Sequence, residues 1–134
     1  MDGALDMTSG VGAVPGHDLT QYLAGYPAEI TFGDDEPAAV FDRYHTRDCI
    51  VYNDGIPLDR DRILAHVRPA RKRAASVTTE VHQALTTDDR VAAHYTLTAS
   101  MRNGSVVATE IYMFGELAAD GRLQRLDQLT RALP

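Results

Sequence analysis

The chain has 134 residues, of which 44% are hydrophobic and 24% charged, a composition typical of one globular domain. Its net charge of −6 disfavours non-specific nucleic-acid binding, because contacts with phosphates need a clustered basic surface. The single Cys49 excludes an internal disulfide framework and no apolar run approaches the about 20 residues that span a bilayer, so we expect a cytoplasmic protein without a membrane segment.

The first half of the chain is expected to be mainly helical. Residues 1–16 are rich in glycine and alanine and lack periodicity, which predicts a flexible tail before a single domain over residues 17–134. Asp18 can cap a helix that runs to Gly33, with Pro27 kinking or splitting it. Pro37 is well placed to open a second, short helix, because proline is tolerated at the first helical position.

A short strand and a third helix are expected next. The strand covers residues 49–53 and ends at Asp54-Gly55. Asp59 caps the helix, whose acidic start and basic end, residues 68–73, complement the helix dipole; Pro69 ends or bends it. The basic cluster could form a phosphate or nucleic-acid patch, but the acidity of the chain favours a solvated helix end.

The last part of the chain predicts four long antiparallel strands. They begin at about residues 76 and 90, and the other two follow Asn103-Gly104 and Asp120-Gly121, each of which is typical of a two-residue hairpin turn. Along residues 90–101 the side chains alternate, with His94 on one face and Tyr95 on the other. Because helices and strands are segregated, we expect an α+β fold with helices on one face of a bent sheet.

Three local patterns carry a resemblance to a known superfamily. Tyr26 lies seven residues before Gly33-Asp34, residues 48–53 form a typical first strand, and Gly121-Arg122-Leu123 opens the last one. With the order of the elements, residues 18–132 resemble the nuclear transport factor 2-like superfamily, in its SnoaL-like polyketide cyclase and ketosteroid isomerase-like branch. The resemblance implies a cone: a strongly curved antiparallel sheet of one short and four long strands, with three N-terminal helices on its concave face.

The resemblance also implies site positions, and they depart from the known catalytic sets. The ketosteroid isomerase positions fall on Tyr26, Asn53 and Met113, and those of limonene-epoxide hydrolases fall on Tyr52, His94, Thr96 and Gln128. Of these, only the two tyrosines keep the residue type of the family, and the asparagine in place of the isomerase base is adjacent to Asp54. Neither catalytic set is therefore intact.

The predicted site is a partly polar pocket on the concave face. Alternation and the resemblance place His94 there, and we expect His94 or Asp54 to act as a base while Tyr26, with Asn53 or His66, stabilises an enolate oxygen. The residues expected to bind the substrate are Tyr22, Tyr52, Asn53, His66, Thr96, Thr98, Ile111, Met113, Leu126 and Gln128. The five histidines lack the spacing of paired ligands, so neither a metal nor another cofactor is expected.

The leading hypothesis is a cofactor-independent enzyme of secondary metabolism. It would remove a proton next to a carbonyl and so isomerise or cyclise, by an aldol reaction, a hydrophobic polyketide-like or steroid-like substrate. Two alternatives stay open: a non-catalytic ligand-binding or carrier protein with the same pocket, and epoxide opening by an activated water. Tyr95, Leu97 and Met101 are expected on the outer face of the sheet, where they predict a homodimer.

Overall fold

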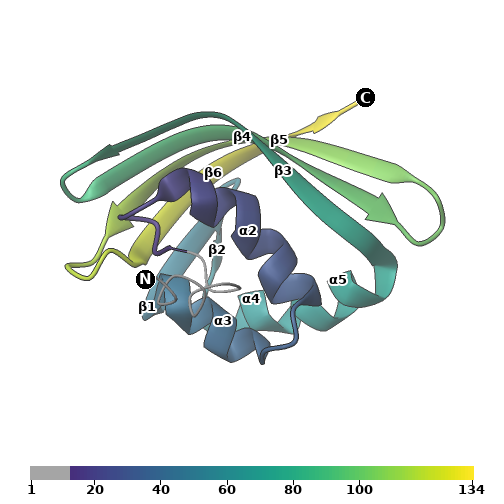
Figure 1. Cartoon of the computed structure of the whole chain (residues 1–134), viewed down its shortest axis with the longest axis horizontal. Coiled ribbons are helices and arrows are strands. Elements are labelled where there is room, and N and C mark those ends of the chain that lie inside the picture. The colour runs from purple at the N-terminus through teal and green to yellow at the C-terminus, as the bar shows by residue number, and fades with distance from the viewer. Residues whose placement is uncertain (1–12) are drawn as a thin grey trace, which may run out of the picture.

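Six strands form one curved sheet with helices along its concave side (Figure 1). Across the sheet the order is β2 (Ile56–Leu58), β1 (His45–Asn53), β6 (Leu123–Leu133), β5 (Val106–Leu117), β4 (Arg90–Met101) and β3 (Ala74–Thr87). The structure is a computed structural model that describes residues 13–134. It confirms the expected α+β cone. The parallel pairing of β1 with β6 and the short strand β2 are additions that the sequence did not reveal.

The helices lie where the sequence predicted them, with one division. Helix α2 (Leu19–Phe32) is capped by Asp18 and runs through Pro27 without a break, and α3 (Pro37–Tyr44) begins at its proline. The third predicted helix is two, α4 (Arg60–Ala65) and α5 (Val67–Arg73). The break follows from Pro69, which has no N–H for the carbonyl of Ala65 and crowds it with its ring. None of the described helices is long and apolar enough to cross a membrane.

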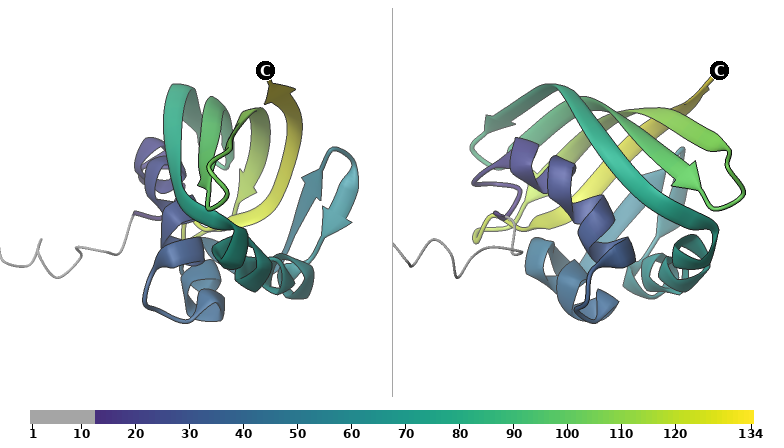
Figure 2. Two further views of the ribbon diagram at one scale, coloured as in Figure 1. Left: turned by 90° about the vertical axis from the view of Figure 1, so that its right-hand side faces the viewer. Right: turned by 45° about the vertical axis from the view of Figure 1, so that its right-hand side comes forward.

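The described chain begins with a segment that packs against the sheet. Pro15 is fully buried, and the N–H of Gly16 donates to the carbonyl of Gly121 in the turn between β5 and β6 at 2.9 Å. The tail predicted over residues 1–16 therefore does not include residues 13–16, and residues 1–12 lie outside the described part. Figure 2 shows where the described chain enters, beside α2.

The turn between β4 and β5 sets which face of β4 is buried. Only Gly104 has a positive φ there, of +92°, and the N–H of Met101 donates to the carbonyl of Ser105 at 2.8 Å. The connection is therefore a three-residue loop ending in a left-handed glycine, not the predicted two-residue turn. A two-residue turn would pair residue 94 with residue 113, whereas the structure pairs His94 with Tyr112.

This shift of one residue inverts the expected faces of β4. Tyr95 pairs with Ile111, and both are buried beneath the helices, while His94 points to the outer face. The prediction that His94 lies on the concave face and that Tyr95 and Leu97 point outward is therefore wrong. The physical reason is the two-residue period of a strand, because a slip of one residue moves every side chain to the opposite face.

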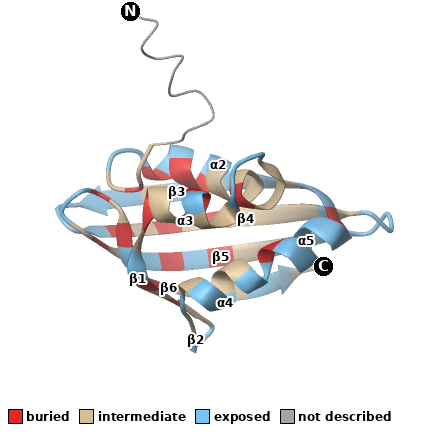
Figure 3. Ribbon diagram, turned by 90° about the horizontal axis from the view of Figure 1, so that it is seen from below, coloured by how far each residue is buried: buried red, intermediate tan, exposed pale blue. Residues whose placement is uncertain are grey.

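The core lies between the helices and the concave face. Seen from the helix side, Figure 3 shows buried segments where α2, α3 and β1 face β4 and β5. Val40, Phe41 and Leu123 are fully buried there, and together with Leu19, Leu23 and Val91 they form one continuous hydrophobic cluster. The strands and helices that carry this cluster also enclose the candidate site.

Gly115 of β5 provides a test of this packing. A Cβ added there would lie 2.6 Å from Leu123 Cδ2 and 2.9 Å from Val91 Cγ2, both on fully packed side chains. We expect Gly115→Ala to lower the free energy of unfolding in urea by about 1–3 kcal/mol. Gly25→Ala in α2, where nothing lies within 4 Å of the new Cβ, is the matched control and should stabilise by up to about 1 kcal/mol. Equal effects at the two positions would contradict this packing.

Candidate functional site

A cavity of about 240 Å³ lies between the helices and the concave face of the sheet. Its walls come from α2, from the junction of α3 and β1, from β2 and α4, and from strands β4, β5 and β6. The polar lining residues are Tyr22, Tyr26, His45, Tyr95 and Gln128. No carboxylate, lysine or arginine is among the described residues that line it, so the cavity presents neutral hydrogen-bonding groups on an apolar wall.

His45 is the buried polar centre of this cavity. Its side chain is 2% exposed, with Nδ1 2.9 Å from the carbonyl oxygen of Phe41 and Nε2 2.7 Å from the hydroxyl of Tyr22. A carbonyl only accepts, so Nδ1 carries the hydrogen and Nε2 accepts the hydroxyl hydrogen of Tyr22. Burial lowers the pKa of His45 to about 4. The imidazole is therefore neutral near pH 7, with one nitrogen able to accept a proton.

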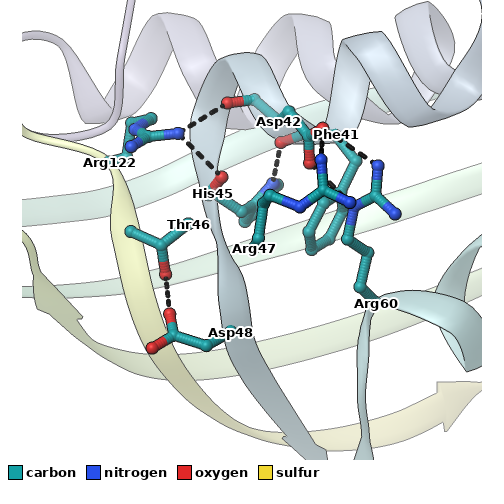
Figure 4. Close-up of polar contacts among 8 residues, drawn as sticks. All are labelled: Phe41, Asp42, His45, Thr46, Arg47, Asp48, Arg60 and Arg122. Carbon is teal, nitrogen blue, oxygen red and sulfur yellow. Dashed lines mark hydrogen bonds and ion pairs between the residues drawn. The ribbon is translucent and has the colours of Figure 1, made fainter.

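Charged groups outside the cavity hold the chain at His45 (Figure 4). Arg122 donates to the carbonyl oxygens of Asp42 and His45 at 3.1 and 3.4 Å, and so ties the end of α3 to the start of β6. The carboxylate of Asp42 accepts two hydrogen bonds from Arg60, at 2.8 and 2.9 Å, and this guanidinium lowers the pKa of Asp42. The backbone that orients the imidazole is thus fixed from the outside.

Three tyrosines share the cavity with His45. The rings of Tyr22 and Tyr26 stack with centroids 5.2 Å apart, and the ring of Tyr26 meets that of His45 at 4.9 Å. Burial raises the pKa of Tyr22 and Tyr26, and that of Tyr95 to about 12, so all three hydroxyls stay protonated. Of the hydroxyls of Tyr22, Tyr26 and Tyr95, only that of Tyr22 has a hydrogen-bond partner in the described part of the chain. Within residues 13–134, the hydroxyls of the half-buried Tyr26 and the buried Tyr95 have no acceptor.

Other residues that the sequence predicted for substrate binding lie at or near the cavity. Ile111 and Leu126 form part of its apolar wall. Gln128 lines it, and its side-chain amide donates to Asn53 Oδ1 at 2.9 Å. Met113 is 1% exposed and belongs to the core.

The predicted base His94 lies on the opposite side of the sheet. Its Nε2 is 2.7 Å from Glu110 Oε2, and its ring stacks on Tyr112 with centroids 4.1 Å apart. Thr96 lies on the same outer face, where its hydroxyl is 2.8 Å from His82 Nε2. The register of β4 therefore shows that His94 and Thr96 do not lie in the cavity, where the sequence predicted them. The residues expected to open an epoxide are then not together in one site.

Four further predicted residues also lie outside the cavity. Tyr52 and Thr98 point to the outer face, where the guanidinium of Arg125 covers the Tyr52 ring at 4.2 Å. His66 is exposed at the break between α4 and α5, with Nδ1 2.7 Å from the carbonyl oxygen of Arg62. The fourth, Asp54, lies in the β1–β2 turn.

Asp54 has a role in the turn that excludes it as the base. With Gly55 it forms the turn between β1 and β2, in which both residues have positive φ, 53° and 86°. Its carboxylate accepts hydrogen bonds from the N–H and hydroxyl of Thr130, at 2.8 and 2.5 Å, and these lower its pKa. A stabilised, exposed carboxylate is a weak proton acceptor, and it does not reach the cavity.

His45 is the residue that sequence analysis missed. It follows Val40, Phe41 and Tyr44, the apolar residues of α3, and lies four residues after Phe41, on the same helical stripe. A histidine that continues such a stripe is a signal for a buried imidazole. In the described part of the chain, no three His, Cys, Asp or Glu side chains are grouped so that they could hold a metal ion.

Comparisons with known proteins place the fold. No family model and no curated protein match the chain. Among solved structures, IdmH, a proposed polyketide cyclase from Streptomyces antibioticus, is 13% identical with a TM-score of 0.64, covering 87% of this chain and 91% of that one. A Catenulispora acidiphila protein with a ketosteroid isomerase-like fold, in complex with trimethylamine, is 12% identical with a TM-score of 0.61, covering 87% and 85%.

A third comparison gives the same result. A proposed SnoaL-like polyketide cyclase from Shewanella denitrificans is 14% identical with a TM-score of 0.62, covering 80% of this chain and 85% of that one. The chain therefore has the nuclear transport factor 2-like cone of SnoaL-like and ketosteroid isomerase-like structures, as the sequence predicted. At these identities the likeness shows the fold.

The buried, neutral state of His45 predicts a pH dependence of stability. Because its folded pKa of about 4 lies below the ordinary histidine pKa of 6.5, the unfolded chain takes up the proton first, so stability is lost as the pH falls from about 6.5 to 4. Between pH 7 and pH 5 we expect the free energy of unfolding in urea to fall by about 2 kcal/mol more in the wild type than in His45→Gln, which cannot titrate. Identical pH profiles would show that His45 is not buried in the neutral form.

Proposed function

We propose that the chain binds a neutral, hydrophobic, carbonyl-bearing small molecule in this cavity and acts on it as a cofactor-independent isomerase or cyclase. The observation that carries the proposal is the pair of cavity hydroxyls, on the half-buried Tyr26 and the buried Tyr95, that have no acceptor among the described residues and lie beside the neutral imidazole of His45. An unsatisfied buried hydroxyl costs about 1–3 kcal/mol, and a ligand carbonyl oxygen would remove that cost. The fold shared with proposed polyketide cyclases supports the same class of substrate.

The size and charge of the cavity limit the ligand. A volume of about 240 Å³ is slightly below the usual range of small-molecule pockets and suits a compact ring system of two or three rings. No cation is among the described lining residues to neutralise an acid, and burying an unpaired charge is very unfavourable. The ligand is therefore neutral, with oxygen atoms as its polar groups.

The proposed reaction begins with transfer of a proton to Nε2 of His45. The proton leaves a carbon next to the carbonyl, the C–H electron pair forms the enolate, and the negative oxygen accepts hydrogen bonds from Tyr26 and Tyr95. Return of the proton to another carbon completes an isomerisation. In the alternative outcome, the enolate carbon attacks a second carbonyl of the same molecule and forms a C–C bond and an alkoxide. The alkoxide takes back the proton from Nε2 of His45, which completes an aldol cyclisation. Tyr22 has to release Nε2 before the first step, because its hydroxyl occupies that nitrogen.

A carrier protein with the same cavity is the second candidate. The described residues that line the cavity include no carboxylate, and the low pKa of His45 makes its imidazole a weak base. The lack of a strong base favours a carrier. A carrier would use the same two hydroxyls to hold the ligand oxygen and would release the ligand unchanged. Epoxide opening is not proposed, since His94 and Thr96 lie on the outer face.

We also propose that the chain forms a homodimer through the outer face of its sheet. Leu85, Tyr112, Phe114 and Leu129 are 65%, 49%, 70% and 66% exposed. The strand register places Leu85, Ala92 and Phe114 in one row across the sheet, and Tyr112 and Leu129 in the next. Such a continuous apolar surface is uncommon on a monomer. It differs from the predicted surface, because Tyr95 and Leu97 line the cavity.

A cytoplasmic location stays a prediction from the sequence. Cys49 is a free thiol that is fully buried, and burial raises its pKa to about 12. An unreactive, unpaired cysteine fits a reducing compartment.

Hydrogen exchange on a small ketone tests the enzyme proposal. The probe is 2-tetralone, a neutral bicyclic ketone with acidic hydrogens next to its carbonyl. We expect the protein to accelerate its hydrogen–deuterium exchange in D₂O, followed by NMR, and His45→Gln to reduce that rate by about a hundredfold or more. Tyr26→Phe with Tyr95→Phe should reduce it by a similar factor, because both enolate donors are lost.

The matched control is His94→Gln, which removes an imidazole on the outer face and should leave the exchange rate unchanged. Exchange that depends on His94 and not on His45 would contradict the proposed site. A ligand that raises the melting temperature of the wild type without any exchange would favour the carrier.

Light scattering tests the dimer. We expect a mass of two chains for the wild type and of one chain for Phe114→Arg, because the substitution buries a charge in the apolar interface. Ile56→Arg, at a comparably exposed apolar residue on the edge strand β2, is the matched control and should keep the dimer mass. A wild-type monomer at micromolar concentration would refute the interface.

A further inference from the structure

The basic side chains of the described chain fall into two groups. One group is paired with aspartate or glutamate, and its members are Arg43, Arg47, Arg60, Arg90, Arg122, Arg125 and Arg131. In the other group no member has a carboxylate partner, and its members are Arg62, Arg68, Arg71, Lys72, Arg73 and Arg102. All of the second group lie on α4, on α5 or in the β4–β5 turn. We call this surface the basic corner.

The basic corner is one continuous surface. The N–H of Arg102 donates to the carbonyl of Arg73 at 2.9 Å, and its guanidinium lies 3.4 Å from the carbonyl of Arg71, so the β4–β5 turn is held against the end of α5. Figures 1 and 2 show this hairpin end beside α5. Figure 3 shows that α4 and α5 are largely exposed. The charges therefore face solvent together.

Stabilisation of a helix end does not account for this segregation. The dipole of α5 favours the three cations of its last turn, residues 71–73, and one of them, Arg71, also donates to the carbonyl oxygens of Thr31 and Gly33 at the end of α2. It disfavours Arg68 in the first turn of the same helix, and it does not involve Arg62 or Arg102. The chain has a net charge of −6, and its other arginines are paired with carboxylates. The cations of the basic corner have no such partner among the described residues and repel one another. Unpaired like charges on one face produce a positive field that attracts an anionic partner.

We propose that the basic corner docks a carboxylate-rich surface of a partner protein. A nucleic acid fits less well, because α4, α5 and the turn carry no aromatic side chain on which bases could stack, and the rest of the chain would repel a long phosphate backbone. An anionic membrane also fits less well, since the larger apolar residues of these helices, Ile63, Leu64 and Val67, pack against the core. Charge complementarity with an acidic protein remains, and it governs association rate and specificity.

The basic corner lies next to the cavity. Ile63 of α4 lines the cavity, so a docked partner would lie beside one of its walls. Docking itself rests on the charges and does not depend on what the cavity binds.

A charge-reversal pair tests the proposal. The variant Arg68→Glu/Lys72→Glu/Arg73→Glu changes three exposed cations of the basic corner. The matched control Arg47→Glu/Arg90→Glu/Arg125→Glu has the same net charge but changes exposed cations that are paired elsewhere. The probe is a fluorescein-labelled, glutamate-rich helical peptide, and binding is followed by fluorescence anisotropy at low and high salt.

We expect the wild type to bind the peptide in a salt-dependent manner, the basic-corner variant to bind at least about tenfold more weakly, and the control to change by less than about twofold. An equal loss of affinity in both variants would mean that binding depends only on net charge, and it would overturn the proposal. Absence of peptide binding to the wild type at low salt would also overturn it. Tighter binding of a labelled single-stranded DNA or of phosphatidylserine vesicles would overturn the choice of partner. If the reversal variant melts early, the three glutamine substitutions at the same positions replace it.

Discussion

The hydrogen bonds of one buried imidazole define the cavity of this protein. His45 joins three elements, because its backbone lies where α3 becomes β1, its Nδ1 donates to the last turn of α3, and its Nε2 accepts from Tyr22 of α2. A buried polar group is stable only when it is hydrogen-bonded, so the two partners fix both the tautomer and the ring orientation. The position of the tyrosines relative to the sheet follows from the same contacts.

The described residues that line the cavity carry no charged side chain, whereas charged side chains lie just outside it. Asp42, Arg60 and Arg122 hold the α3–β1 junction through ion pairs and hydrogen bonds to backbone carbonyls, where water still reaches them. On the inside, the same junction presents only a neutral imidazole. This division is what desolvation requires, because a buried ion needs a partner whereas a neutral group needs only its hydrogen bonds. The ligand class follows from it.

Much of the fold was predictable, and the error at the site has one local cause. The bounds of β4, the Asp18 cap and the Pro37 helix start follow from local patterns, whereas the cone was implied by the resemblance to a known superfamily. Asn103-Gly104 correctly predicted a turn, but the dipeptide does not determine whether two or three residues form the loop. That one-residue difference moved His94 out of the cavity and Tyr95 into it. His45 was not predicted because it carries no paired-ligand spacing, and its one signal in the sequence is its position directly after the apolar stripe of α3.

The two imidazoles on opposite faces of the sheet show why residue type alone does not assign a base. His94 has a carboxylate partner in Glu110, whose pKa is lowered by His94 and Arg131, but it lies on the outer face of the sheet and does not reach the cavity. His45 is buried in the cavity wall, no carboxylate is among the described residues that line the cavity, and burial makes the imidazole a weak base. A weak base beside preorganised hydroxyl donors is best suited to removing protons that are already acidic, such as those between two carbonyl groups or between a carbonyl group and an aromatic ring. Under the proposed function, the acidity of the substrate would therefore decide whether the cavity acts as an enzyme site or only binds its ligand.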